Sequence, residues 1–292
     1  MPRALMRFTP FNFSSNFAFI RPENQKAGGI YLEKITSKTN TKIKYAAKLV
    51  RDSSFRKKEK LFTVEGLRIC LDAAESGIEI RDIFFTENEY SKHPGDLEKI
   101  FSHTKNIYEC SEEIFKKLSD TGTPQGIFCV CAFGENIKPF SALKDEGKYI
   151  ALENIQDPSN LGAIARTAEA LGIDGAILFD CCDVYNPKVL RGSMGSLFRL
   201  PVFKGESMEE FISFAREKGY SIFTTSTDKN SDKITDLPPC DRMICIIGNE
   251  GNGVKKSTEE LCDRRVTIPM LGRAQSLNAS MAACITMWEM LR

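Results

Sequence analysis

The chain has 292 residues, of which 42% are hydrophobic, and its 40 lysine and arginine residues are balanced by 39 aspartate and glutamate residues. This length favours two domains of ordinary size, and the balanced charge neither indicates nor excludes a nucleic-acid partner. No apolar run approaches the ~20 residues that a membrane-spanning helix needs, so we expect no membrane association.

The ten cysteines do not form a metal-binding pattern. The closely spaced pairs Cys129 and Cys131, and Cys181 and Cys182, fit no zinc spacing, and both histidines lie elsewhere in the sequence. Most cysteines lie in apolar runs, where a thiol packs as a small hydrophobic side chain. We therefore expect no metal and reduced thiols in a cytoplasmic protein, the alternative being a redox role for some of them.

Residues 1–31 are rich in aromatic residues, poor in acidic ones and interrupted by Pro10 and Pro22. Because they lack a continuous apolar core, they do not resemble a secretory signal. We expect a disordered leader that is dispensable for the fold. An organelle-targeting segment, or a start codon assigned too far upstream, are the alternatives.

Residues 34–60 contain ten basic residues and only two acidic ones. Apolar residues recur among them at helical spacing, which predicts an amphipathic helix with a cationic outer face. Acidic residues at i+4 are almost absent, so the charges are not paired within this helix. Unpaired cations are typical of a surface that binds phosphates, and Lys42, Lys44 and Lys48 are the expected RNA contacts. A solvated helix face is the alternative.

Alternating strands and helices then predict a small α/β domain over residues 32–133. We expect strands at 61–65, 80–86 and 127–132, and helices at 66–76 and at 111–118, the latter capped by Ser111. Residues 134–148, with Pro139 and several charged residues, are expected to form a linker.

A second alternating series follows over residues 149–292. The expected strands are 149–155, 175–179, 221–225, 243–248 and 265–268. The expected helices are 159–171, 187–196, 208–218, 254–262 and 277–291. Strands separated by helices predict a mainly parallel sheet with helices on both faces, so the fold class is α/β.

Three segments of this second domain follow an expected strand and lead into a helix: residues 154–166, 248–253 and 268–278. Ligands bind beyond the carboxyl ends of the strands in such sheets. In the first segment, Ser159 or Asn160 is the expected helix cap, and small residues around Arg166 would let a ligand or another backbone approach closely. A plain cap followed by a surface arginine is the alternative.

The second segment, GNEGNG, surrounds Glu250 with glycines. Its residue order and late position do not fit a dinucleotide fingerprint, and it lacks the Gly-Lys-Ser/Thr of a phosphate-binding loop. Backbone binding of a neutral or cationic ligand fits better, and a simple tight turn is the alternative. In the third segment, Ser276 is the expected cap of a last helix that is too apolar for an exposed position. Core burial together with a subunit contact would explain that composition.

The motifs as a set resemble one family. These motifs are NIQDPSNLG leading to Arg166, then YNPKVLRGS at residues 185–193 and Leu200-Pro201, then GNEGNG, then IPMLGRAQSLN. They resemble, in this order, the motifs of the SpoU (TrmH-like) RNA 2′-O-ribose methyltransferases. FTVEGLR at residues 62–68 and PQG at 124–126 resemble the substrate-binding domain of that family, a small fold like certain ribosomal proteins. The resemblance covers the chain from about residue 34, and the leader matches nothing.

The resemblance implies a C-terminal domain tied in a trefoil knot, a homodimer formed through that domain, and S-adenosylmethionine as the cofactor. The implied cofactor contacts are Thr225, Gly248, Ile268 and Leu277. The implied catalytic positions are Asn160, Arg166, Glu250, Ser276 and Asn278. Arg68, in the substrate-binding motif, is an expected RNA contact.

The expected activity is transfer of a methyl group from S-adenosylmethionine to a ribose 2′-hydroxyl of structured RNA. A guanidinium stays protonated, so we expect Arg166 to clamp the adjacent phosphate and stabilise the developing 2′-alkoxide, and the general base stays unassigned. The ribosomal-protein-like domain favours rRNA over tRNA, without identifying the nucleotide. The alternatives are a tRNA ribose methyltransferase, a base methyltransferase, and a non-catalytic RNA-binding or ribosome-assembly protein of the same fold.

Overall fold

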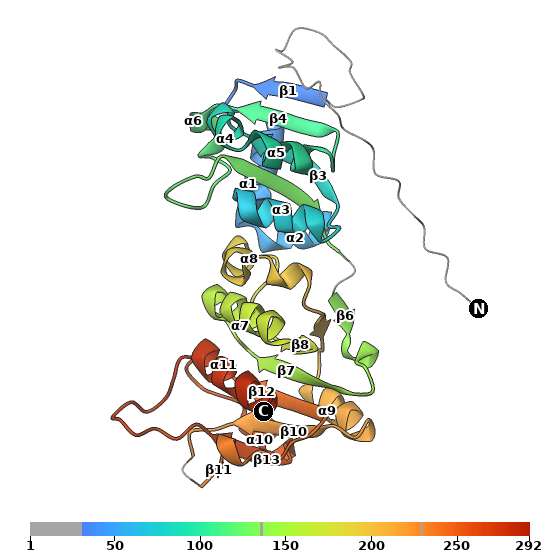
Figure 1. Ribbon diagram of the computed structural model, residues 1–292, viewed down its shortest axis with the longest axis vertical. Helices are drawn as coiled ribbons and strands as arrows, with labels where there is room; N and C mark the ends of the chain where they lie inside the picture. Colours follow the sequence, from blue (N-terminus) through green and yellow to red (C-terminus); the bar gives the residue numbers. More distant parts are fainter. Residues whose placement is uncertain (1–30, 135–136, 229) are drawn as a thin grey trace, which may run out of the picture.

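The computed structural model describes residues 31–134, 137–228 and 230–292, which form two α/β domains stacked along the long axis of the molecule (Figure 1). Apart from Tyr31, which begins the first strand, the expected leader lies outside the described residues. Within the described ranges, no helix is both long and apolar enough to cross a membrane.

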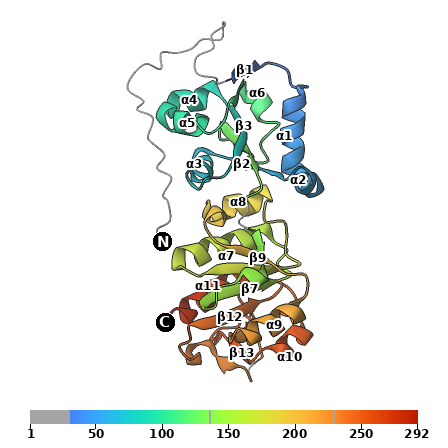
Figure 2. The same ribbon diagram turned by 90° about the vertical axis from the view of Figure 1, so that its right-hand side faces the viewer.

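The N-terminal domain contains a mixed five-stranded sheet in the order β1-β4-β3-β5-β2. Its strands β1, β4 and β3 are parallel, and β5 runs antiparallel to both β3 and β2. Helices α1, α2 and α6 lie on one face, and α3, α4 and α5 on the other (Figure 2). The bounds are β1 (Tyr31–Ile35), α1 (Thr41–Arg51), α2 (Ser53–Glu59), β2 (Leu61–Glu65), α3 (Leu67–Glu75), β3 (Ile80–Phe85), α4 (Glu87–Lys92), α5 (Pro94–Phe101), β4 (Asn106–Cys110), α6 (Glu112–Phe115) and β5 (Ile127–Ala132).

The expectation of a single basic helix over residues 34–60 is wrong. Its first residues belong to strand β1, and the remainder is divided between α1 and α2. The division occurs at Asp52, which ends α1 in an extended conformation and caps α2 by accepting a hydrogen bond from the Phe55 amide at 2.9 Å. An aspartate side chain competes in this way for backbone donors and favours a helix start over a helix interior.

The C-terminal domain contains an eight-stranded sheet in the order β11-β13-β10-β12-β7-β8-β9-β6, and every described strand pair in it is parallel. Strands β7, β8 and β12 each carry five consecutive buried residues, because helices cover both faces. The strands are β6 (Ile137–Pro139), β7 (Gly147–Glu153), β8 (Gly175–Phe179), β9 (Val202–Lys204), β10 (Ser221–Thr225), β11 (Asp232–Lys233), β12 (Arg242–Ile247) and β13 (Arg264–Thr267). Part of the segment expected as a linker thus forms the edge strand β6.

Helices α7 (Pro158–Leu171) and α11 (Ala279–Met290) cover one face of this sheet, and α9 (Met208–Glu217) and α10 (Lys256–Leu261) cover the other (Figure 2). The short helix α8 (Pro187–Ser193) lies between α7 and the N-terminal domain. It ends earlier than expected, because Met194 and Gly195 adopt left-handed conformations. After β13 the chain returns to the middle of the sheet, where α11 contacts α7, β7 and β12.

The strand order positions the three motif segments. Strands β13, β10, β12 and β7 are consecutive neighbours in the sheet, and they are parallel, so their carboxyl ends meet at one edge. Residues 154–166 follow β7, residues 248–253 follow β12 and residues 268–278 follow β13. The fold therefore brings together three segments that lie far apart in the sequence, at the place where α/β sheets bind ligands.

Candidate active site

The first segment turns sharply at the end of β7. Asn154 has a positive φ of 57°, and Asp157 then caps α7, its Oδ1 accepting hydrogen bonds from the Ser159 amide and hydroxyl at 2.8 and 2.6 Å. The expectation that Ser159 or Asn160 caps the helix is wrong. Since Asp157 takes this role and Pro158 starts the helix, the Asn160 side chain is left to make other contacts.

The second segment forms a closed turn. Asn249 and Gly253 exchange two backbone hydrogen bonds of 2.9 Å, and a Cβ on Gly248 would lie only 2.1 Å from the Gly253 carbonyl carbon. Only glycine fits this close approach. The Asn249 side chain donates through Nδ2 to the Asn154 carbonyl at 2.9 Å, so the turn is attached to the first segment.

The third segment leads into α11, whose cap is Asn278. Its Oδ1 accepts hydrogen bonds from the Ser280 amide and hydroxyl at 2.9 and 2.6 Å. The expectation that Ser276 caps this helix is wrong. Ser276 is exposed and makes no hydrogen bond with the described residues.

A chain of hydrogen bonds joins the three segments. The Asn278 side-chain amide donates to Asn160 Oδ1 at 3.0 Å, and Asn160 Nδ2 donates to Glu250 Oε1 at 3.0 Å. The same Glu250 oxygen accepts from the Asp157 amide at 3.0 Å. Asn160 is 4% exposed, so its side of both hydrogen bonds is shielded from water, while Glu250 and Asn278 are exposed. Three of the five predicted catalytic residues therefore form one network.

Glu250 is the charged end of this network. Partial burial of its carboxylate would raise the pKa, but hydrogen bonds from Asn160 and from backbone amides, including those of Asp157 and Gln156, outweigh this effect. The pKa of Glu250 is held below its ordinary value. The carboxylate is therefore ionised at neutral pH and acts only as an acceptor, which fixes the direction of the hydrogen bonds that reach it.

Arg166 and Ser276 lie outside the network. Arg166 is on the exposed side of α7, and its guanidinium makes no hydrogen bond or ion pair with the described part of the chain. A protonated guanidinium without an internal partner remains able to bind an anionic ligand with its five donors.

The predicted cofactor contacts lie along the same edge of the sheet. Thr225 ends β10, Gly248 follows β12 and Ile268 follows β13, and these three strands are adjacent. Leu277 immediately precedes the cap of α11. Backbone groups at the ends of parallel strands, together with a turn that only glycine permits, suit a ligand held by the main chain.

The predicted RNA-binding side chains of the N-terminal domain differ in whether they already contact other residues of the chain. Lys42 forms a 2.6 Å ion pair with Glu33 and lies over the Tyr108 ring at 4.2 Å. Lys48 lies over the Phe55 ring, whereas Lys44 is exposed without a described partner, as is Arg68 at the start of α3.

The expectation that the basic stretch is unpaired is therefore wrong in part, because acidic residues from other segments provide partners. The ion pairs from this stretch are Lys34 with Glu109, Lys38 with Glu113, Lys42 with Glu33, and Arg56 with Asp183.

A buried carboxylate that the sequence did not single out holds the far end of the glycine turn. Glu153, the last residue of β7, accepts hydrogen bonds from the Lys255 amide at 2.9 Å and from the Thr258 hydroxyl at 2.8 Å. Its partners are more than one hundred residues away, so one sequence carries no signal for this role. The role of Asp157 could have been recognised, because an acidic residue directly before a proline is a typical helix start.

The cysteines are free thiols, and burial raises the pKa of Cys110 and of Cys262 to about 12. In the ranges that the structure covers, no three histidine, cysteine, aspartate or glutamate side chains are grouped as a metal site would require.

Comparisons with known proteins agree with both domains. The SpoU rRNA Methylase family matches residues 147–288, and the MRM3-like substrate binding domain matches residues 40–129. The 23S rRNA (guanosine(2553)-2′-O)-methyltransferase RlmP of Bacillus subtilis (strain 168) is 30% identical over 260 residues, which cover 89% of this chain and 99% of that protein. The 23S rRNA (uridine(2479)-2′-O)-methyltransferase of Streptomyces viridochromogenes is 29% identical over 266 residues, covering 89% and 92%.

Solved structures are similar over the same length. The AdoMet-bound rRNA methyltransferase from Sinorhizobium meliloti has a TM-score of 0.79 at 25% identity, covering 89% of this chain and 97% of that one. The SpoU methyltransferase AviRb from Streptomyces viridochromogenes, in complex with AdoMet, has a TM-score of 0.75 at 26% identity, covering 86% and 97%. These likenesses confirm the expected fold class, a knotted C-terminal domain with a mainly parallel sheet beside a small N-terminal α/β domain.

Proposed function

Because this chain belongs to the SpoU (TrmH-like) family of RNA methyltransferases, we propose that it methylates a ribose 2′-hydroxyl of ribosomal RNA. It is an enzyme that uses S-adenosylmethionine. The observation that carries the proposal is the hydrogen-bonded chain Asn278–Asn160–Glu250, which unites three motif segments at the carboxyl ends of the strands and leaves Arg166 exposed on the adjoining helix.

The residues at this edge fit the cofactor. Thr225, Gly248, Ile268 and Leu277 would hold it through main-chain groups, and the absence of a side chain at Gly248 keeps the turn closed against Gly253. The bound cofactor supplies an activated methyl group on a sulfonium. The chain's own contribution is alignment, which is worth up to ~7–11 kcal/mol in favourable cases.

Arg166 has the role of binding RNA beside the reacting hydroxyl. Its protonated guanidinium would hold the neighbouring phosphate and stabilise the negative charge that develops on the 2′-oxygen. Glu250 and Asn160 hold the first two segments in register, and Asn278 holds the third. Ser276, exposed on the third segment, is available to contact RNA.

Ribosomal RNA is the proposed substrate for two reasons. Both named relatives act on 23S rRNA, and the N-terminal half matches a substrate-binding domain. The named relatives come from bacteria, in which ribosomal RNA lies in the cytoplasm, and we place the activity there. A non-catalytic role is disfavoured, because three of the five proposed catalytic residues are joined in one network.

A homodimer through the C-terminal domain is part of the proposal. Helix α11 buries one side against α7, while Met281 and Trp288 on the other side are 53% and 59% exposed, with Ile285 and Leu291 also exposed. An apolar face of this kind on the last helix fits contact with a second copy of the chain.

The substrate class is tested by methyl transfer from labelled S-adenosylmethionine to unmodified transcripts. We expect saturable incorporation into large-subunit rRNA and little into a tRNA pool at the same mass concentration. Preferential methylation of tRNA would contradict the choice of substrate while leaving the enzyme class intact.

A further inference from the structure

The two domains are joined by more than the connecting chain, because a buried ion pair crosses between them. Arg56 of α2 is 2% exposed, and its Nε and Nη2 both donate to Asp183 Oδ2, at 2.9 and 2.7 Å. Its Nη1 donates to the Leu49 and Val50 carbonyls at 2.7 and 3.0 Å. This guanidinium therefore makes two hydrogen bonds to the N-terminal domain and two to Asp183, which follows strand β8.

A second ion pair fixes a loop of the N-terminal domain. Arg191 of α8 binds the two carboxylate oxygens of Asp120, its Nη1 donating to Oδ1 at 2.5 Å and its Nη2 to Oδ2 at 3.0 Å. The loop that carries Asp120 is also held from within its own domain, because the buried carboxylate of Glu65 accepts from the Ser119 hydroxyl and the Gln125 amide at 2.8 and 3.0 Å. The loop projects on the same side of the molecule as the 268–278 segment (Figure 1).

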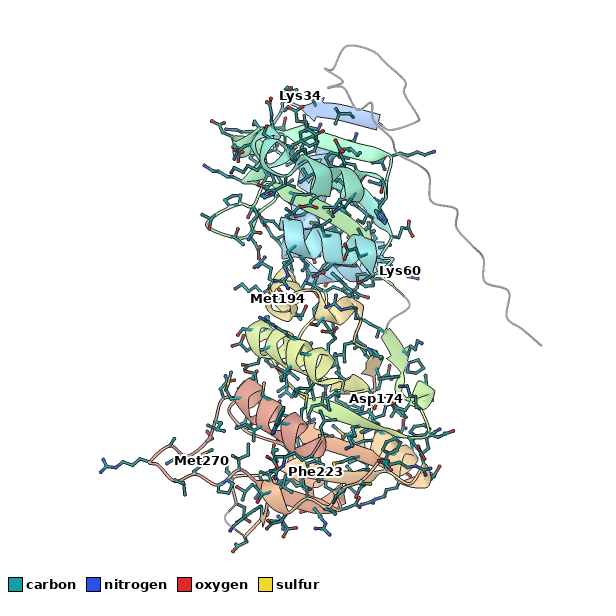
Figure 3. The ribbon with its side chains drawn as sticks, in the orientation of Figure 1. Lys34, Lys60, Asp174, Met194, Phe223 and Met270 are labelled. Carbon is teal, nitrogen blue, oxygen red and sulfur yellow. The ribbon has the colours of Figure 1, made fainter. Side chains whose placement is uncertain are left out.

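Aromatic packing adds to the two ion pairs. The Tyr185 ring stacks on Phe133 and Phe62, with centroid distances of 3.9 and 4.8 Å. Phe62 belongs to β2 and Tyr185 lies two residues before α8, so the contact crosses the domain boundary, and Figure 3 labels Met194, which follows α8, between the two domains. Stacked rings of this kind resist both sliding and rotation.

The junction also reaches the candidate active site through the helix pair α7 and α8. A Cβ on Gly162 of α7 would lie 2.7 Å from the Val189 carbonyl oxygen and 2.9 Å from the Gly192 Cα. The two helix backbones are thus in direct contact, and α7 carries both Asn160 and Arg166. The N-terminal domain, α8 and the proposed RNA-clamping arginine are connected by rigid packing throughout.

We propose that this junction is a fixed spacer that selects which nucleotide of the RNA is methylated, with Arg56, Asp120, Asp183 and Arg191 as positioning residues. The inference rests on the proposed function. If the N-terminal domain holds the RNA, only a nucleotide at one distance and orientation from that domain reaches Arg166. A mobile connection would instead present several neighbouring riboses, whereas packed interfaces do not deform continuously.

The test uses Arg191→Asp, because this pair is partly exposed and its reversal leaves the buried Arg56 pair in place. The full chain is incubated with S-adenosylmethionine and an unmodified large-subunit rRNA transcript, and 2′-O-methyl positions are mapped by resistance to alkaline hydrolysis. We expect the wild type to modify one nucleotide. We expect R191D to modify it about tenfold less efficiently or worse, since small misplacements are costly, and to spread methyl groups to neighbouring riboses.

The double variant D120R/R191D restores the ion pair with reversed charges, and we expect it to regain the single position. The matched control is Arg216→Asp, which breaks the Arg216–Asp263 pair inside the C-terminal domain and should leave the methylation map unchanged. Thermal midpoint and S-adenosylmethionine affinity are measured for each variant, so that loss of fold is recognised.

Two outcomes overturn the inference: R191D keeps the wild-type map and efficiency, or the folded double variant behaves like R191D. The second outcome would mean that Arg191 contacts RNA directly. Failure of the proposed function is distinguishable from both, because the wild type itself would then place no methyl group on any ribose.

Discussion

Substitution of Asn160 by aspartate tests the network with a nearly isosteric change. Asn160 Nδ2 donates to Glu250 Oε1 at 3.0 Å, so the substitution replaces that donor with a carboxylate oxygen at almost the same position. Two negative charges would then face each other between the first and second motif segments. The acceptor that binds the Asn278 amide is retained, so the link to the third segment is left in place.

The magnitude follows from the distance. Two unit charges 3.0 Å apart repel by about 1.4 kcal/mol in bulk water and about 5.5 kcal/mol at an effective dielectric constant of about 20. Asn160 is 4% exposed but Glu250 is exposed, so the effective value lies between these limits. A cost of about 3 kcal/mol in holding the segments together corresponds to a loss of roughly a hundredfold in kcat/KM at alkaline pH.

The assay is steady-state methyl transfer to an rRNA transcript as a function of pH. Close carboxylates raise the pKa of one member, and the proton that they then share restores a donor between them. The activity of N160D relative to wild type should therefore rise as the pH falls from about 8.5 to about 6. Wild-type kcat/KM at pH 8.5, or a ratio independent of pH, would refute the reasoning. Asn252→Asp is the matched control, because it adds the same charge to the exposed glycine turn at a side chain without a described partner.

Three further predictions concern separate surfaces. Arg166→Ala should raise the activation free energy of methyl transfer by about 2.7–4 kcal/mol and leave S-adenosylmethionine affinity unchanged. A variant that retains more than about a tenth of wild-type turnover would contradict the role of Arg166. Trp288→Asp should shift the sedimentation coefficient from that of a dimer to that of a monomer, and an unchanged dimer would exclude α11 as the interface. Glutamine at Lys42, Lys44 and Lys48 should flatten the slope of log RNA affinity against log salt by roughly 0.7–0.9 for each phosphate that is no longer bound, with the ion-paired Lys42 contributing least. An unchanged slope and affinity would identify this stretch as a solvated helix face.

The central strands could be predicted because their local pattern is complete. Strands β8 and β10 have the expected bounds. Strand β8 is a continuous buried run and β10 contains several β-branched residues, and turn residues follow each of them. Strands β1 and β4 were not predicted. They pair with each other, β1 at the edge of the sheet, and contain several polar residues, so the conformation of β1 depends on a partner about seventy-five residues away. The break at Asp52 was also missed, because the basic residues continue to Lys60 although the helical spacing of apolar residues stops at Val50.

The sequence named three residues that the structure brings together, Asn160, Glu250 and Asn278, but it did not give the contacts between them. Asn160 bonds to Glu250 and Asn278 across 90 and 118 residues, and these contacts require β12 to pair beside β7. Local capping was misassigned at both helices, because serine, aspartate and asparagine compete for the same backbone donors and the turn geometry decides among them. The charge on Lys42 was assumed free, since its partner Glu33 lies on a strand that the sequence did not indicate.

The proposed activity is tested most directly by locating the transferred methyl group. An unmodified large-subunit rRNA transcript is incubated with the full chain and S-adenosylmethionine, digested to nucleosides and analysed by mass spectrometry. We expect a single 2′-O-methylnucleoside, with the added mass on the ribose fragment, and its loss in the Arg166→Ala variant. A methyl group on a base fragment, or no methyl group on any nucleoside while S-adenosylmethionine still binds, would contradict ribose methylation by this enzyme.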